Sequence, residues 1–407
     1  MPRTTLCLAM LTAAMSGCAS RPVGAPPGTE VPLPWGAVDP ATAEPAGGSS
    51  DDTVLILAGS GSLTAYGAGV LCGWTEAGTR PEFRTVAASS TSGLIATYAF
   101  LGPEYDTQLH ELVTGINTLD VYRQLGLVSS MTTGAINGSG PLRDLVERIV
   151  DENLLDEVAT QHARGRRLFI GTMNVDNGTE VIWDMGAIAS SRRPDRLERY
   201  RDVVVAASSL PIIMPPVYIP VEMEVLSNEE VSADQPADGT EDPAPAPEPR
   251  MEEYWQMHVD GATLEPVLLS RFMLRRSAGG RLYVLLSVDF DRRVAYPTPV
   301  RASVREISWA VISANAKAGL IRDVSRAYVL ANLDDIEFRV AAIPSGFEDV
   351  PRLQIFDPDS MQELFQGGFD HAAAGAQWRS IPPGVSVEEI LDEMRRDRAA
   401  TMSEPVE

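Results

Sequence analysis

The chain has few cysteines, and none is available for a disulfide inside a folded domain. Of the three, Cys7 lies in an apolar stretch at the N-terminus and Cys18 directly follows that stretch, which leaves Cys72 alone. A fold held together by internal disulfides is therefore excluded. Cys72 stands in an apolar helical run and is expected to be a core residue rather than a reactive thiol.

Basic residues are scarce as well. Against 56 Asp and Glu residues there are 33 Lys and Arg residues, which gives a net charge of −23, and Lys317 is the only lysine. Such a surface repels phosphate backbones, so nucleic-acid binding is excluded. It also argues against electrostatic docking on anionic lipid, and any attachment to a membrane is expected to use an anchor instead.

Histidines and long apolar runs are also few. The four histidines, His110, His162, His258 and His371, show no metal-ligand spacing such as His-x-x-x-His, so we predict no zinc site. Beyond the extreme N-terminus, no apolar stretch of the sequence is long enough to span a bilayer.

The N-terminus has the features of a secretion signal rather than of a folded segment. Arg3 supplies a positive charge, and residues 6–15 form an apolar core that is too short to span a membrane as a helix. The run Met15-Ser16-Gly17-Cys18 resembles a bacterial lipobox, with Met in place of the usual Leu. That resemblance implies that residues 1–17 are removed and that Cys18 is acylated, which favours an outer-membrane anchor on the periplasmic side. The alternative is an ordinary cleaved signal in which Cys18 has no role.

Composition divides the rest of the chain into a tether, one domain and a tail. Residues 18–52 are rich in Pro, Gly, Ala and Ser, and we expect a flexible tether. The folded domain is predicted to span residues 53–399. Within it, residues from about 222 to 253 are acidic and proline-rich, which predicts a disordered insertion. Residues 400–407 are expected to form a disordered tail.

Apolar patterns inside the domain predict strands that alternate with helices. This alternation argues for a parallel sheet covered by helices on both faces. The expected strands are Val54–Leu57, Phe83–Ala88, Leu168–Met173, Val181–Trp183, Val203–Ala206, Leu282–Val288 and Ile336–Ala341, and the expected helices include Ala65–Trp74, Ser90–Phe100, Pro141–Leu155 and Val304–Leu330.

Three local motifs can carry chemistry. The run Gly59–Thr64 follows a predicted strand and precedes a predicted helix, so its backbone N–H groups can converge on an anion. Ser90 stands at a second strand-to-helix turn, which is the arrangement of a nucleophile elbow. Asp260, followed by Gly261, can face a pocket from the end of a strand. Each motif alone also fits a simpler structure: a tight turn, a helix N-cap and an ordinary turn.

The combination of the three motifs is far more specific than any one of them. Gly59-Ser60-Gly61, Ser90 about thirty residues later, and Asp260-Gly261-Ala262 resemble the patatin-like phospholipase family. The resemblance implies a three-layer α/β/α sandwich with a mostly parallel central sheet. It covers roughly residues 53–380 and includes the runs Ala65–Leu71, Leu94–Ala96, Phe100–Gly102, Gly171–Asn174, Val181–Gly186, Ala206–Pro211 and Phe356–Pro358, together with Met361.

The resemblance also implies a lipid acyl hydrolase of the phospholipase A or esterase type that uses a Ser–Asp dyad. Carried over to this sequence, Ser90 is the nucleophile and Asp260 is the base. The backbone around Gly59, Ser60 and Gly61 is the implied oxyanion hole. The implied substrate is a membrane lipid or fatty-acyl ester, and no metal or organic cofactor is implied.

The motifs depart from the family pattern at several positions. The family's glycine run typically reads Gly-Gly-Gly-x-Arg-Gly, whereas Ser60, Leu63 and Thr64 occupy three of those places. Its elbow has glycines where Ala88 and Ser92 stand. Loss of φ freedom or of one oxyanion donor costs roughly 10²–10³ in rate. An attenuated or catalytically inactive lipoprotein that binds lipid or a protein partner is therefore the alternative function.

Other polar residues give weaker alternatives. A triad in α/β-hydrolase order would combine Ser90 and Asp260 with His371, although nothing around His371 marks it as catalytic. Asp176 and Asp184 are acids near predicted strand ends, and we interpret them as structural.

Overall fold

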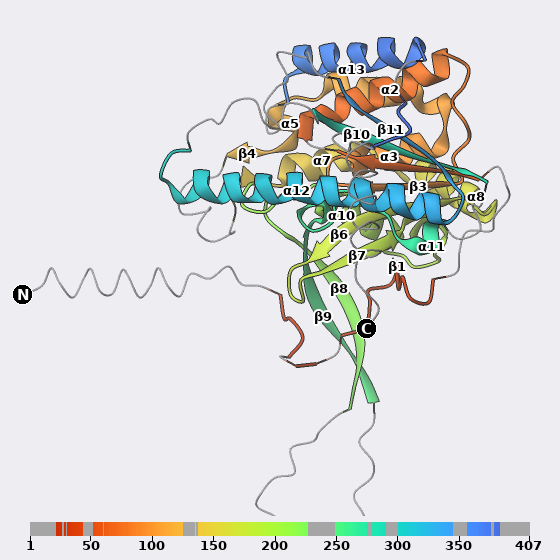
Figure 1. The fold of residues 1–407 in the computed structure, drawn as a ribbon. Coiled ribbons are helices and arrows are strands. Elements are labelled where there is room, and N and C mark those ends of the chain that lie inside the picture. Colours follow the sequence, from red (N-terminus) through yellow and green to blue (C-terminus); the bar gives the residue numbers. More distant parts are fainter. Residues whose placement is uncertain are drawn as a thin grey trace, which may run out of the picture.

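The fold is a mixed, mostly parallel sheet with helices on both faces (Figure 1). It is taken from a computed structural model, which describes residues 22–26, 28–29, 31–43, 52–59, 61–124, 135, 137–226, 249–274, 279–289, 300–344, 356–375 and 378–382. The sheet runs in the order β1-β7-β6-β3-β2-β10-β11, and the β8–β9 hairpin joins it through β6. The strands are β1 Ala37–Val38, β2 Thr53–Ala58, β3 Thr85–Ser89, β6 Arg167–Asn174, β7 Thr179–Asp184, β8 Val217–Leu226, β9 Pro249–Asp260, β10 Arg281–Asp289 and β11 Glu337–Ile343, and β4 Arg123–Gln124 pairs separately with β5 Asn137–Gly138.

Helices form the two outer layers of this three-layer α/β/α sandwich. In Figure 1, α2 and α13 lie above the sheet and α12 lies across its other face. The α-helices are α2 Thr64–Glu76, α3 Ser92–Leu101, α4 Asp106–Gly115, α5 Thr118–Val121, α7 Gly140–Ile149, α8 Glu152–Ala163, α9 Met185–Ser190, α10 Arg196–Ala207, α11 Arg271–Leu274, α12 Val304–Leu333 and α13 Pro358–Ala373, and short 3₁₀ turns are η1 Gly61–Leu63, η2 Pro103–Tyr105 and η3 Gly261–Thr263. Among the described residues, no helix is both long and apolar enough to cross a bilayer.

The alternation of side chains along each strand explains why both faces need cover. In β2, Leu55 and Leu57 pack into the apolar cluster that includes α2, α3 and α13. Val54 and Ile56 point the other way, into the cluster formed with α11 and α12. Every residue of β2 is buried, as expected for a central parallel strand.

Strand register brings the three predicted motifs to one edge of the sheet. β2 and β3 are parallel neighbours, so the glycine loop after β2 and Ser90 after β3 leave the sheet at the same edge. β6 pairs with β3 as far as Ala88 opposite Ile170. Two residues further along the same edge of β6, Thr172 pairs with Asp260 at the end of β9. β9 therefore pairs with the part of β6 that lies beyond the end of β3, and this pairing places Asp260 beside the turn that contains Ser90.

Helices α2 and α13 approach each other so closely that their backbones touch. A Cβ atom at Gly69 would lie 2.0 Å from the carbonyl oxygen of Phe365, and one at Gly73 would lie 2.2 Å from that of Phe369. In the other direction, a Cβ atom at Gly368 would lie 2.3 Å from the carbonyl oxygen of Tyr66. The helix that follows the glycine loop is thus held directly by a helix near the end of the domain.

Most predicted elements are present, and two predictions were wrong in detail. Val203–Ala206 was expected to be a strand, but it forms the last turn of α10, in which Val203–Ala207 are buried. A short apolar run in a fully buried position cannot distinguish a helix from a strand. The predicted helix Pro141–Leu155 is two helices, because the chain is extended at Val150 and Asp151, and the Asp151 side chain caps α8.

Parts of the predicted tether and insertion are ordered. Within the tether, β1 pairs with β7, and the backbone N–H of Trp255 donates to the carbonyl of Val23. The expected insertion contributes its two ends to the β8–β9 hairpin, in which Leu226 pairs with Pro249. Residues 1–21, 227–248 and 383–407, which include the signal, Cys18 and the tail, lie outside the described residues.

Candidate active site

Ser90 occupies a tight turn between β3 and α3. Its backbone has a φ of 58°, in the left-handed region that non-glycine residues rarely adopt. The flanking Ser89 hydroxyl donates to the carbonyl of Pro266 over 2.7 Å, which holds the end of β3 in place. The turn therefore keeps the strained geometry of an elbow although neither flanking glycine of the usual pattern is present.

A glycine on the neighbouring loop relieves the crowding at this elbow. A Cβ atom at Gly59 would lie 2.2 Å from the Ser92 hydroxyl and 2.8 Å from the Ser92 backbone nitrogen. Ser92 can stand in place of the usual glycine because Gly59 has no side chain across from it. The crowding that Ser92 introduces at the elbow is thus avoided because Gly59, on the neighbouring loop, has no side chain.

Asp260 ends β9 and begins η3. Its Oδ1 accepts a hydrogen bond from the backbone N–H of Ala262 over 2.9 Å. The following Gly261 is required, because a Cβ atom there would lie 2.6 Å from the carbonyl oxygen of Gly171 in β6. The Asp-Gly-Ala motif therefore presses the turn against β6 and presents the carboxylate to the elbow.

Ser90 and Asp260 meet in the protein interior. The Ser90 hydroxyl donates to Asp260 Oδ2 over 2.7 Å, and the two residues are 6% and 2% exposed. Burial raises the pKa of Asp260 to about 7, although the hydrogen bonds from Ser90 and Ala262 oppose this rise. A carboxyl group with a pKa near neutrality is suited to taking and returning a proton.

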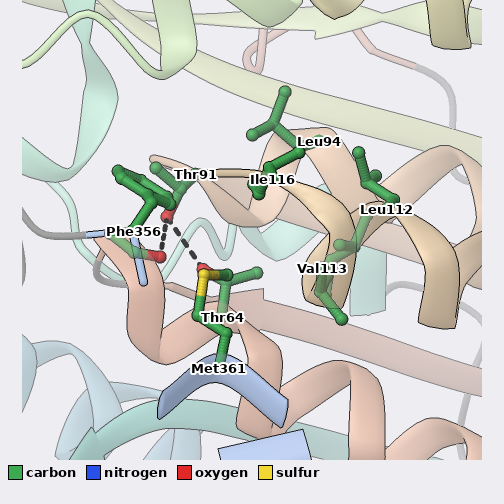
Figure 2. Close-up of a pocket in the computed structure, with 10 residues that line it drawn as sticks. Thr64, Thr91, Leu94, Leu112, Val113, Ile116, Phe356 and Met361 are labelled. Atoms are coloured by element: carbon green, nitrogen blue, oxygen red, sulfur yellow. Dashed lines mark hydrogen bonds between the residues drawn. The ribbon is translucent and has the colours of Figure 1, made fainter. Parts of the chain in front are cut away.

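The glycine loop lies against the elbow through threonine side chains. The Thr91 hydroxyl donates to the carbonyl of Gly61 over 3.2 Å and lies 2.8 Å from the Thr64 hydroxyl (Figure 2). Gly61 has a φ of 54°, which only glycine adopts without strain. No sequence pattern connects Thr64 with Thr91, since the two residues belong to different loops. Ser60, the third residue of the predicted oxyanion hole, lies outside the described residues.

A small apolar cavity opens beside these two loops (Figure 2). Its volume is about 10 Å³, roughly the room that one water molecule needs. Gly61, Thr64 and Thr91 close one side, and the two threonine hydroxyls already bond to each other or to Gly61. The remaining lining is apolar and comes from α3, α4 and the region of α13, namely Leu94, Ile95, Leu112, Val113, Ile116, Phe356 and Met361.

The histidine of the alternative triad has a different partner. His371 Nδ1 lies 2.9 Å from the hydroxyl of Tyr66, whereas both oxygens of Asp260 are occupied by Ser90 and Ala262. His258 is fully buried against Thr172, and burial lowers its pKa to about 3, so it carries no charge near neutral pH.

The two remaining acids have structural contacts. Asp176 accepts a hydrogen bond from the backbone N–H of Met257. Asp184 accepts one from the backbone N–H of Ala187 and so caps α9. These contacts agree with the interpretation of both acids as structural.

Comparison with known proteins gives one decisive match. The sequence model of the family described as patatin-like phospholipase matches residues 55–271, which is more than half of the chain. The chain belongs to the patatin-like phospholipase family. Membership indicates lipid acyl hydrolysis as the general activity, and it confirms the fold class expected from the sequence.

Two further comparisons add little to this family assignment. No curated protein matches this patatin-like chain. Among solved structures, VipD from Legionella pneumophila is similar with 9% identity and a TM-score of 0.33, over 82% of this chain and 68% of that one. The matched range of this patatin-like phospholipase includes Gly59, Ser90 and Asp260.

Proposed function

We propose that this chain is a serine lipid acyl hydrolase of the phospholipase A or esterase type, which uses Ser90 and Asp260 as a dyad. The observation that carries the proposal is the 2.7 Å hydrogen bond from the Ser90 hydroxyl to the buried Asp260 carboxylate, made by a serine at positive φ. A structural serine does not require such strain, whereas a sharp turn that aims a nucleophile does.

The reaction begins when a substrate ester lies with its carbonyl carbon next to Ser90. Asp260 takes the proton from Ser90 Oγ as this oxygen bonds to the carbonyl carbon. The resulting tetrahedral oxyanion is stabilised by backbone N–H groups of the glycine loop around Gly61 and by the amino end of α2. Asp260 then returns the proton to the alcohol that leaves, and an acyl group remains bonded to Ser90.

Water completes the cycle by the reverse pattern of proton transfers. Asp260 takes a proton from water as the water oxygen attacks the acyl carbonyl, and Ser90 leaves with that proton. The products are a fatty acid and the deacylated alcohol, and no metal or organic cofactor takes part. The apolar lining of the cavity beside Thr91 is suited to an acyl chain, and it must move apart to admit more than a group of the size of one water molecule.

The location of this reaction is a further part of the proposal. Acylation of Cys18 would tether the domain to the periplasmic side of a bacterial outer membrane, where lipid substrate is abundant. Val23, five residues after Cys18, bonds to Trp255 on β9. An anchor at Cys18 would therefore hold the domain close to the bilayer rather than at the end of a long tether. Labelling the cells with a radioactive fatty acid tests this: Cys18→Ser should abolish incorporation.

The dyad is tested by hydrolysis of a chromogenic fatty-acyl ester. We expect Ser90→Ala and Asp260→Ala each to lower the rate at least about a thousandfold. Asp176→Asn is the matched control, because it changes a carboxylate at another strand end, one that accepts a hydrogen bond from the Met257 backbone rather than from the nucleophile. Equal activity in Ser90→Ala and the unaltered chain would refute the dyad.

The altered motifs support a second candidate function, a lipid-binding protein without turnover. Leu63 and Thr64 replace family residues in the glycine run, and Ala88 and Ser92 replace glycines at the elbow. A folded chain that fails to hydrolyse both soluble esters and phospholipid vesicles, and whose Ser90 does not react with a fluorophosphonate, would favour this candidate.

A further inference from the structure

The amino-terminal half of α12 lacks any buried side chain among its described residues. α12 has 30 residues, and Leu320, Val324, Ala327 and Ala331 in its carboxyl-terminal half are buried against the sheet. From residue 306 to residue 318, every described side chain is exposed or only half-buried. This part of the helix spans roughly 20 Å.

The unburied half of α12 projects from the edge of the sheet that carries Ser90. β10 and β11 are parallel, so α12, which connects them, returns from the carboxyl edge of the sheet to the amino edge. Its amino-terminal half therefore lies at the carboxyl edge, where β3 ends in the elbow. Figure 1 shows this half extending past the ends of the strands.

One contact ties the midpoint of α12 to the elbow itself. A Cβ atom at Gly319 would lie 3.2 Å from the Pro266 ring, so the helix passes close to Pro266 at this point. The carbonyl of Pro266 accepts the hydrogen bond from Ser89, the residue before the nucleophile. α12 thus lies beside the site at Gly319, and the part of the helix that precedes Gly319 extends outward from the site.

This projecting half is largely apolar, and Glu306 in its first turn is its one acidic residue. Ile307 and Val311 are 50% and 54% exposed on one stripe of the helix. No acidic residue occurs between Glu306 and Asp323, in a chain whose net charge is −23. Residues 300–318 instead contain three basic residues, including the only lysine, and one acidic residue. An acidic protein can approach an anionic lipid surface most easily through such a segment.

We propose that residues 304–318 of α12 dock on a phospholipid bilayer that contains anionic lipid, with Ile307 and Val311 entering the interfacial region. The inference rests on the proposed lipid hydrolysis in one respect, the choice of a bilayer as the partner of this helix. A bilayer against residues 304–318 would face the edge of the sheet that carries Ser90. Docking would bring the membrane to the elbow, so that a lipid need not leave the bilayer completely to reach it. A second copy of the chain is the competing occupant.

A polarity-sensitive fluorophore attached at single positions tests the docking without hydrolysis. The full chain carrying Ser90→Ala is labelled at Ile307→Cys or Val311→Cys and mixed with vesicles of phosphatidylethanolamine and phosphatidylglycerol in equal parts. Val329→Cys and Leu333→Cys are the matched controls, because these residues are 53% and 70% exposed on the other end of the same helix. The chain's own cysteines are Cys7, Cys18 and Cys72, and the chain without an added cysteine measures their background. Cys72 is buried, and burial raises the pKa of its thiol to about 12.

We expect vesicles to shift the emission at positions 307 and 311 to the blue, with a several-fold gain in intensity, and to leave positions 329 and 333 nearly unchanged. Equal responses at all four positions would overturn the proposal. A blue shift that grows with protein concentration in the absence of vesicles would also overturn it, in favour of a second copy.

Kinetics provide a second readout that separates this inference from the proposed function. Ile307→Ser combined with Val311→Ser should lower the ratio of the vesicle rate to the soluble-ester rate about tenfold, which is the expected loss from half-exposed side chains of this size. Val329→Ser combined with Leu333→Ser should leave that ratio unchanged. If the unaltered chain hydrolyses no ester, the proposed function fails, while the fluorescence result still decides the docking.

Discussion

The free energy of unfolding should depend on pH through Asp260. Burial raises the pKa of this carboxyl from 3.8 to about 7. The folded state therefore binds a proton that the unfolded chain releases between about pH 4 and pH 7. The contribution of Asp260 to stability is complete below the unfolded pKa and is lost as the pH rises through the folded pKa. Ionising Asp260 in the fold costs about 4 kcal/mol in total, of which about 3 kcal/mol falls between pH 5 and pH 8.

The substitution Asp260→Asn removes this ionisation and keeps the shape of the side chain. The amide oxygen of asparagine can still accept one of the two hydrogen bonds that come from Ser90 and Ala262. We therefore expect Asp260→Asn to lose less stability than the unaltered protein between about pH 5 and pH 8, by about 3 kcal/mol. Stability above pH 7 should rise relative to the unaltered protein, although hydrolysis is abolished.

Urea denaturation of both proteins at several pH values measures this difference. Ser90→Ala is the control, because it retains the carboxyl group and should keep most of the pH dependence. The same carboxyl group should govern hydrolysis, whose rate is expected to rise with pH to a plateau above about 7. Parallel stability curves for the unaltered protein and Asp260→Asn would refute the assignment of a buried, proton-binding carboxyl group at this position.

Three further changes give separate tests of the site. Gly59→Ala should abolish hydrolysis, because its Cβ atom would lie 2.2 Å from the Ser92 hydroxyl, whereas Gly115→Ala, with no atom within 4 Å of its Cβ position, should have full activity in the same ester assay. Thr91→Val removes the hydroxyl that donates to the Gly61 carbonyl, and it should lower kcat several-fold with little change in KM. Thr91→Ser retains the hydroxyl and should restore kcat. An equal loss of kcat in both variants would contradict this role of the hydroxyl. Met361→Ala should destabilise the fold by about 2–5 kcal/mol and shift the preferred acyl-chain length upward in a series of esters, and an unchanged preference would exclude the cavity as the acyl site.

The central part of the fold could be predicted because its strands are buried on both faces. In β2 and β3, uninterrupted apolar runs end in small residues, and this pattern is typical of the central strands of a parallel sheet. The same reasoning wrongly predicted a strand at Val203–Ala206. This part of α10 is also fully buried, and a short buried apolar run has the same sequence pattern in a helix as in a strand.

The β8–β9 hairpin shows a different limit of the sequence pattern. Residues from about 222 to 253 are acidic and proline-rich, and this composition predicts disorder for the two ends of the hairpin as well. Glu222 and Glu224 are nevertheless exposed in alternation with the buried Val221 and Met223, which is the pattern of a strand with one covered face. The alternation is short, and only its pairing with β9 gives it meaning.

Residues of the candidate site that belong to local motifs could be proposed from the sequence, whereas residues that reach it only through packing could not. Ser90 and Asp260 belong to local motifs, and the structure brings their side chains together. The link between Thr64 and Thr91 depends on two loops meeting in space, and no local pattern indicates it. Phe356 and Met361 reach the cavity from the last quarter of the chain, so their part in it could not be derived from spacing.

The backbone contact between α2 and α13 also determines when, during folding, the region around the glycine loop can be completed. α2, which follows the glycine loop directly, is held by Phe365 and Phe369, about 300 residues later in the chain. β2 likewise needs β10 as its second neighbour. A chain that emerges from its N-terminus cannot complete the region around Gly61 until α13 has emerged, and contacts of such long range slow folding. We therefore expect chains truncated before α13 to be inert in the ester assay, because the glycine loop is completed only when the last helix of the domain is present.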